Sequence, residues 1–186
     1  NKPSNTIIGE VKAIDKDIGE NNRINYFIFQ DDSNLFTVDN QTGEIRVISS
    51  LDREQRAKYV FIVAAEDPTV QSSPPSTIEV TVIIEDENDS SPVFTGPEML
   101  TVYVNENVAN VVLTQLTASD QDESDNQQLT FFIQTDTDKF VIDSSTGSLT
   151  NKFPLDREID NRYFLVIGVT DHGTVPLQAF LNFTVY

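Results

Sequence analysis

The sequence predicts an all-β protein made of two tandem Greek-key β-sandwiches of about seven strands each. Three observations predict this fold class: short apolar runs rich in β-branched and aromatic residues, turn residues between the runs, and a second half that repeats the motifs of the first. The 186 residues, of which 38% are hydrophobic, are enough for two modest cores.

The two halves carry the same motifs in the same order. Residues Ala13–Asp17 and Ala118–Asp122 both have the form Ala-x-Asp-x-Asp. The string Leu51–Glu54 recurs unchanged as Leu155–Glu158. Such self-similarity is the signature of a repeat architecture, so we expect two modules of one family, covering residues 1–89 and 90–186.

The apolar runs of the first module read as strands. Alternation of apolar and polar residues in 58–63 and 79–84 is typical of half-buried strands. Asn40–Gly43 and Ser144–Gly147 are predicted hairpin turns, in which Gly supplies a positive φ. The strands are expected within residues 6–13, 24–29, 35–38, 45–48, 59–65 and 78–84.

A polar stretch, Asp86–Phe94, joins the modules. Asp and Asn are poor strand formers, and Pro92 has no N–H group for a ladder, so the stretch is not a strand interior. Two interpretations are open from this stretch alone: a solvated acidic loop, or a site for a hard cation, which takes six to eight oxygen ligands.

Composition excludes several functions. The formal charge of −18 argues against binding nucleic acid or an anionic membrane surface, both of which need basic patches. There is no Cys, so there is no disulfide framework. Three N-glycosylation sequons, which begin at Asn40, Asn88 and Asn182, are compatible with a secreted glycoprotein. The aromatic residues Phe61, Phe94, Phe132 and Tyr163 are expected in the cores.

The acidic residues fall in loops at the two ends of each predicted sandwich. The loops after the strands predicted at 6–13 and 59–65 share one end, and the loop before the strand at 59–65 lies at the other. The acids at the first of these ends are Asp15, Asp17 and Asp67 in the first module and Asp120, Asp122 and Asp171 in the second. The acids at the other end are Asp52 and Glu54 in the first module and Asp156 and Glu158 in the second.

In this order and spacing, the A-x-D-x-D, L-D-R-E and D-x-N-D-x-x-P-x-F motifs resemble extracellular cadherin repeats over essentially the whole chain. The resemblance implies that the linker and the facing ends of the two repeats bind three Ca²⁺ ions. Its implied side-chain ligands are Asp52, Glu54, Asp86, Asn88, Asp89, Asp120, Asp122, Asn126 and Asp171, while Glu87 and Ser90 would offer backbone carbonyls. The ions would act as structural clamps.

The resemblance also implies half-sites at the outer ends and three departures from the family pattern. The half-site residues are Asp15, Asp17, Asn21 and Asp67 at one end and Glu106, Asp156 and Glu158 at the other. The family places a Glu before an Asn in the first strand of each repeat, as in Glu106-Asn107. Because Asn1 aligns with Asn107, the resemblance implies that the first repeat lacks its first strand here and that the equivalent Glu is expected just before residue 1. Ser90 stands where the family usually has Asn, and Ser124 where the first repeat has Gly19, which is expected to reshape the loop before Asn126.

Two enzymatic or metal-binding alternatives fail. An EF-hand loop starting at Asp15 would need Glu at its twelfth position, where Tyr26 stands. Paired carboxylates such as Asp52 and Glu54 serve glycosidases, but their repetition in both modules favours a structural role. We therefore expect no enzyme.

The resemblance implies a function in Ca²⁺-dependent cell adhesion. The chain would be part of the extracellular domain of a membrane-anchored protein, with other cadherin ectodomains as partners, of the same or a different type. The alternative is a mechanical spacer with no adhesive surface of its own.

Overall fold

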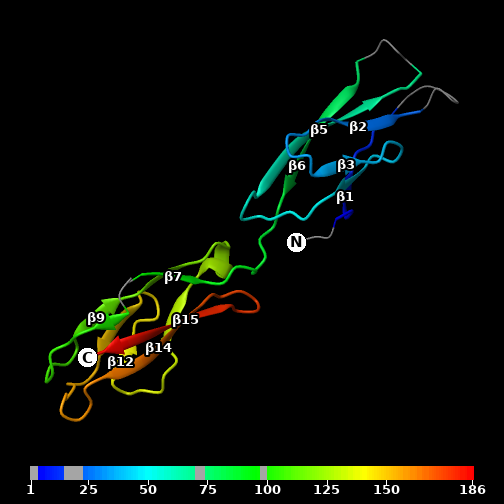
Figure 1. The fold of residues 1–186 in the computed structure, drawn as a ribbon. Helices are drawn as coiled ribbons and strands as arrows, with labels where there is room; N and C mark the ends of the chain where they lie inside the picture. The colour runs from blue at the N-terminus through cyan, green and yellow to red at the C-terminus, as the bar shows by residue number, and fades with distance from the viewer. Residues whose placement is uncertain (1–3, 15–22, 70–73, 97–99) are drawn as a thin grey trace. The chain divides into compact units, whose positions relative to one another are not determined.

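The computed structural model describes residues 4–14, 23–69, 74–96 and 100–186, and the chain divides into two compact units, Asn1–Glu85 and Asp86–Tyr186 (Figure 1). We expected the division after Asp89; in the structure the linker residues 86–89 pack with the second unit. The predicted all-β class is confirmed, because the helical structure of the described residues is a single 3-10 turn, η2 (Ser124–Gln127).

The first unit contains two antiparallel sheets, ordered β1-β4-β3 and β2-β5-β6. Their strands are β1 (Ile7–Glu10), β2 (Asn25–Gln30), β3 (Phe36–Val38), β4 (Glu44–Val47), β5 (Lys58–Glu66) and β6 (Ser76–Ile83). Each lies within one to three residues of the predicted run. Inward-facing residues of these strands, among them Phe36, Val47 and Phe61, form the core.

The second unit contains sheets ordered β11-β14-β15-β8, β12-β13-β9 and β10-β7. Its strands are β7 (Val93–Gly96), β8 (Thr101–Val102), β9 (Val112–Gln115), β10 (Thr117–Ser119), β11 (Thr130–Ile133), β12 (Phe140–Ile142), β13 (Ser148–Asn151), β14 (Tyr163–Thr170) and β15 (Gln178–Val185). β8 pairs parallel with β15, and the other pairs are antiparallel. Leu116, Leu149, Ile167 and Phe183 are at the centre of the core.

The predicted hairpin turns occur at equivalent places in the two units. Gly43 has a φ of 73° and Gly147 a φ of 71°, as such turns require. The carboxylates of Asp39 and Asp143 each accept two hydrogen bonds from backbone N–H groups of the turn. These hydrogen bonds lower the pKa of both carboxyls, because they favour the charged form.

One core prediction is wrong. Phe61 is buried, and Phe94 and Tyr163 pack against the core of the second unit, as expected. Phe132, however, lies on the outer face of β11, because Phe131 takes the inward position and successive strand residues point to opposite faces. The Phe132 ring covers Gly168 and makes an edge-to-face contact with Phe180 at 5.9 Å.

Within the described ranges, no helix has the length and apolar character needed to cross a membrane.

Candidate metal-binding site

The linker is held at one end of the second unit by hydrogen bonds. The Asp86 carboxylate accepts hydrogen bonds from the side-chain amide of Asn126, at 2.9 Å, and from the backbone N–H of Glu123, at 3.1 Å. The backbone N–H of Ser90 donates to Asp122 at 3.3 Å. Linker residues therefore meet the loop that follows β10 and the η2 turn.

Asn88 connects the linker to the loop between β14 and β15. Its amide nitrogen donates to both carboxylate oxygens of Asp171 at 3.3 Å and to the carbonyl of Val175 at 2.9 Å. The Asn88 amide also fills the space that a side chain at Gly173 would need. This close approach was not predicted, because it depends on the path of a loop that is distant in the sequence.

Three aspartates of this end of the second unit are buried. Asp120 is 7% exposed, Asp122 0% and Asp171 1%. Asp171 accepts hydrogen bonds at 3.0 Å from the backbone N–H groups of Gly173 and Leu177. These hydrogen bonds offset part of the free-energy cost of burying its carboxylate.

Several oxygens of this cluster have no donor. Asn88 Oδ1, Asp120 Oδ2 and Asp122 Oδ1 are buried and, among the described residues, accept no hydrogen bond. Buried polar atoms are normally paired, so these oxygens need a partner. Burial raises the pKa of the Asp122 carboxyl, and the charges of Asp120 and Asp86 raise it further against the opposing hydrogen bonds from Ser90.

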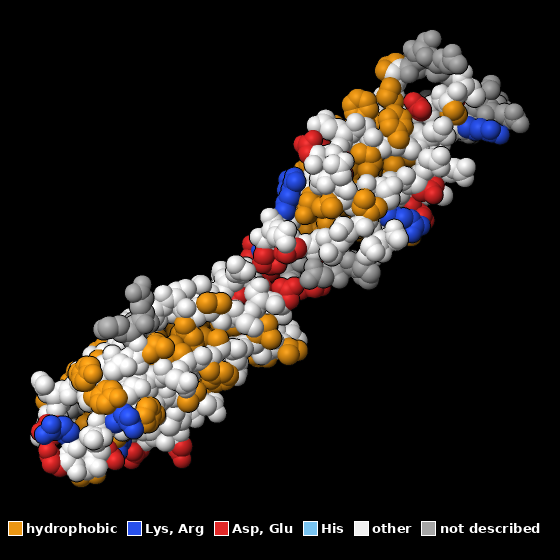
Figure 2. Space-filling model, viewed as in Figure 1, with side chains coloured by type: hydrophobic (Ala, Val, Ile, Leu, Met, Phe, Trp, Pro, Cys, Tyr) orange, Lys and Arg blue, Asp and Glu red, His pale blue; other side chains and the backbone are white. Residues whose placement is uncertain are grey.

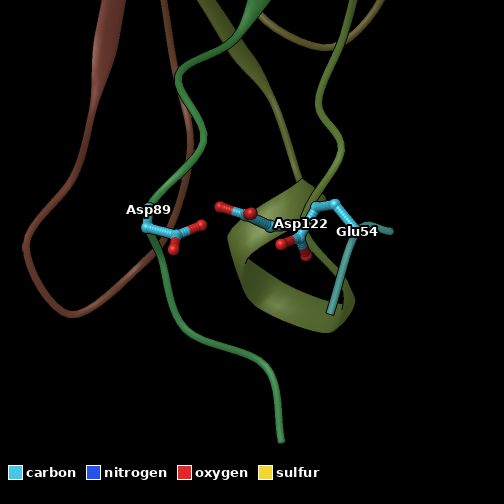
Figure 3. Close-up of side chains that lie close together, drawn as sticks. All are labelled: Glu54, Asp89 and Asp122. Atoms are coloured by element: carbon cyan, nitrogen blue, oxygen red, sulfur yellow. The ribbon is translucent and has the colours of Figure 1, made fainter. Parts of the chain in front are cut away.

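The arrangement suits a hard cation. Oxygens of Asp89 and Asp122 lie within 4.8 Å of one another, and their carboxylates face each other (Figure 3). The donors are carboxylate, amide and carbonyl oxygens, the set that Ca²⁺ takes, and the cluster offers no Cys or His. A divalent cation would supply the missing partner of the buried oxygens.

The other end of the second unit carries a second acidic cluster. Carboxylate oxygens of Glu106, Asp156 and Glu158 lie within 4.8 Å of one another, and all three residues are exposed. Glu106 accepts a hydrogen bond from the backbone N–H of Arg157 at 3.3 Å. The structure thus brings together the residues expected as one outer half-site.

The candidates of the first unit make local contacts. Asp52 accepts hydrogen bonds from the backbone and side chain of Gln55, at 3.2 and 2.7 Å, and the backbone hydrogen bond lowers the pKa of its carboxyl. Glu54 forms an ion pair with Arg53 at 3.0 Å. Asp67 accepts two hydrogen bonds of 2.7 Å from Thr69. Asp15, Asp17 and Asn21 lie outside the described residues.

Sequence reasoning missed Val175, whose carbonyl holds Asn88 and which belongs to no recognisable motif. It singled out Ser124, which has a φ of 55°, the left-handed backbone that Gly adopts easily, and which begins the η2 turn before Asn126. In the sequence, the Gly in Asp171-His172-Gly173 is the local signal that another side chain, here that of Asn88, approaches the backbone closely.

Comparison with known proteins identifies the family. A family model described as "Cadherin domain" matches residues 1–85 and 100–186. Human Protocadherin-11 X-linked is 37% identical over 179 residues, which are 95% of this chain and 13% of that protein. Human Protocadherin Fat 4 is 36% identical over 179 residues, covering 95% of this chain and 4% of that protein. The chain therefore spans a small part of the length of these relatives.

Solved structures agree with the sequence comparison. A crystal structure of mouse Cadherin-23 EC22-24 matches with a TM-score of 0.88 and 31% identity, covering 100% of this chain and 59% of that one. A Protocadherin gammaB7 EC3-6 cis-dimer structure matches with a TM-score of 0.85 and 25% identity, covering 100% and 48%. The chain belongs to the cadherin family: it consists of two tandem cadherin repeats and is not an enzyme.

Proposed function

We propose that the two repeats form a Ca²⁺-dependent module of an extracellular adhesion protein, in which ions bound at the linker stiffen the connection between the repeats. One observation carries this proposal. The linker packs on the buried acidic end of the second unit, where oxygens of Asn88, Asp120 and Asp122 are buried and find no donor among the residues that the structure describes. A chain with a formal charge of −18 is stabilised by bound divalent cations, because they reduce its self-repulsion.

The proposed ligands come from the linker and from both repeats. The second unit supplies Asp86, Asn88, Asp89, Asp120, Asp122, Asn126 and Asp171, with backbone carbonyls from Glu87 and Ser90. The family resemblance adds Asp52 and Glu54 of the first repeat. The ion supplies positive charge to buried carboxylates, while the protein fixes the ligand oxygens through the hydrogen bonds that hold Asp86 and Asn88.

The outer half-sites extend the same proposal. Glu106, Asp156 and Glu158 already lie together, and a further linker would complete a Ca²⁺ site there. The half-site at the other outer end consists of Asp15, Asp17, Asn21 and Asp67 of the first repeat, which would serve a preceding linker.

The proposed location is the cell surface, in the ectodomain of a membrane-anchored protein. The proposed partners are other cadherin ectodomains. A protocadherin relative has been solved as a cis-dimer, which supports contacts between cadherin chains. The alternative is a spacer that transmits force and sets reach. Sedimentation velocity with and without Ca²⁺ separates the two: Ca²⁺-dependent self-association supports homophilic adhesion, and a compact monomer at all concentrations favours the spacer or a heterophilic role.

Calorimetric titration of the chain with Ca²⁺ tests the metal site. We expect Asp89→Ala to weaken Ca²⁺ binding at least tenfold, because Asp89 faces Asp122 across the cluster. Asp136→Ala is the matched control, since Asp136 is an exposed acid of the same unit outside the cluster. The control should give the wild-type isotherm. Equal losses in both variants would mean that Ca²⁺ responds to diffuse charge, and no heat of binding in the wild type would refute the site.

A further inference from the structure

The strand residues on the outer face of the sheet β11-β14-β15-β8 are uncharged and partly aromatic, and the guanidinium of Arg162, which precedes β14, lies over the Phe164 ring at 4.4 Å. Antiparallel partners share a face, and the register pairs Phe164 with Thr184, Val166 with Asn182 and Gly168 with Phe180. Phe164 is 61% exposed and Phe180 is 50% exposed. The strand residues on this face include no Asp or Glu, although the chain has a formal charge of −18.

Hydrophobic side chains on the second unit are visible along β14 and β15 (Figure 2). Apolar groups that gather on one face are typical of an interaction surface, whereas singly scattered ones are normal. Phe132, Phe164 and Phe180 gather on this one face.

A glycosylation sequon, Asn182-Phe183-Thr184, lies in β15 in the middle of this face. Strand alternation directs Asn182 and Thr184 outward, while Phe183 is buried in the core. Asn182 is exposed, so its amide and the Thr184 hydroxyl stand on the same accessible side of the strand. The sequon is thus intact, and its exposed Asn leaves the folded unit room for a glycan at this position.

Phe180 lies two residues before Asn182 and on the same face. Its ring contacts Phe132 edge-to-face at 5.9 Å, with an interplanar angle of 89°, which fixes the orientation of the exposed ring. Sugar rings have apolar C–H faces that pack on aromatic rings. The first sugar on Asn182 would thus pack against the exposed ring of Phe180, whose orientation is already fixed.

We propose that Asn182 carries an N-linked glycan whose first sugars pack on Phe180 and cover the outer face of this sheet. In the transfer, Asn182 Nδ2 forms a bond to C1 of the first sugar of a lipid-diphosphate-linked oligosaccharide. The bond from C1 to the diphosphate oxygen breaks, the lipid diphosphate leaves with the electron pair, and Nδ2 loses one proton. The inference rests on the extracellular location in the proposed function.

The other two sequons lack this setting. The Asn88 amide nitrogen donates to Asp171 and Val175, and its side chain is packed against Gly173, so the folded unit has no room for a glycan there. Asn40 lies in the exposed β3–β4 turn. An Asn40→Gln background therefore leaves Asn182 as the acceptor to be measured.

The occupancy experiment uses the chain secreted from mammalian cells behind a secretion signal, in the Asn40→Gln background. Glycopeptide mass spectrometry should find a glycan at Asn182 in most molecules and none at Asn88, and Asn182→Gln should remove one glycan mass. An unmodified Asn182 in the secreted chain overturns the proposal. Ca²⁺ titration of the same samples reports separately on the metal site, so the failure of one proposal is distinguishable from failure of the other.

Hydroxyl-radical labelling tests the covering. We expect labelling of Phe180 to fall at least twofold in the glycosylated chain relative to Asn182→Gln. Phe153 is the control, because it is 51% exposed and follows a strand of a different sheet, so its labelling should not change. Equal labelling of Phe180 in the two samples would show that the glycan does not pack on this face.

Discussion

Removal of Ca²⁺ should lower the melting temperature of the second unit. Removal of the buried charge of Asp122 should leave that temperature unchanged or raise it when Ca²⁺ is absent. Asp122 is fully buried, one of its oxygens has no donor within the described part of the chain, and burial raises the pKa of its carboxyl. The charged carboxylate of Asp122 therefore destabilises the folded unit when no cation is bound, and it is needed to bind the cation. Asp122→Asn keeps the size of the side chain and an oxygen that can accept the Ser90 hydrogen bond.

The expected magnitudes follow from the geometry. Two unit charges at 4.8 Å, the outer limit for the Asp89 and Asp122 oxygens, repel by about 3.5 kcal/mol at an effective dielectric constant of 20. Water around the exposed Asp89 reduces this value. Ca²⁺ at a hundredfold excess over Kd adds about 2.7 kcal/mol to the stability of the native state. For a unit of this size, that gain raises Tm by roughly 10–20 °C.

Scanning calorimetry in Ca²⁺, in Mg²⁺ and in chelator measures these effects. In chelator, Asp122→Asn should melt at or above the wild-type temperature, whereas in Ca²⁺ it should melt below the wild type. Asp136→Asn, an exposed acid of the same unit, should follow the wild type in every buffer. Mg²⁺ should give a smaller gain, because it demands octahedral geometry and dehydrates reluctantly. The reasoning fails if the wild-type Tm is the same in Ca²⁺ and chelator, or if Asp122→Asn gains as much as the wild type.

Three further predictions concern the fold. Gly147→Ala should lower the free energy of unfolding in urea by about 1–3 kcal/mol, because Gly147 has a φ of 71° and a Cβ would strike the Leu116 carbonyl. Gly9→Ala is the control and should change this free energy little, because a Cβ there meets no described atom within 4 Å. Phe61→Ala should lose about 3–5 kcal/mol from the unfolding transition of the first unit, and a loss below 1 kcal/mol would contradict its place in the core. Asp143 has a lowered pKa, so its stabilising effect is present above the ordinary value of 3.8 and is lost as pH falls through the lowered pKa. The Tm difference between wild type and Asp143→Ala should therefore shrink on acidification, and a difference independent of pH would contradict the role of the charge.

The strands were predictable because they depend on local pattern. β5 alternates buried and exposed residues as its sequence indicates, and the Gly43 and Gly147 turns have the positive φ that their motifs require. Phe132 was mistaken for a core residue because two successive aromatic residues do not reveal which one faces inward. That choice depends on the register of β11 with β14, where Phe132 lies opposite Gly168.

The residues of the candidate site were predictable from the sequence, but the contacts among them were not. Repetition of the acidic motifs in both halves, together with the family resemblance, led to Asp120, Asp122 and Asp171, which the structure brings together with the linker. The hydrogen bond from the Asn126 side chain to Asp86 and that from Asn88 to Val175 join segments far apart in the chain. Such contacts depend on loop paths, which no local motif encodes.

The space at Gly173 makes the length and composition of one loop a determinant of linker orientation. The Asn88 amide occupies the place of a side chain at this position and is held by the carbonyl of Val175, two residues further on. A side chain at 173 would collide with the Asn88 amide, and one inserted residue before Val175 would move the carbonyl that holds it. Variation in this short loop would therefore change how Asn88 is held at this end of the second unit, while the residues proposed as Ca²⁺ ligands stay the same.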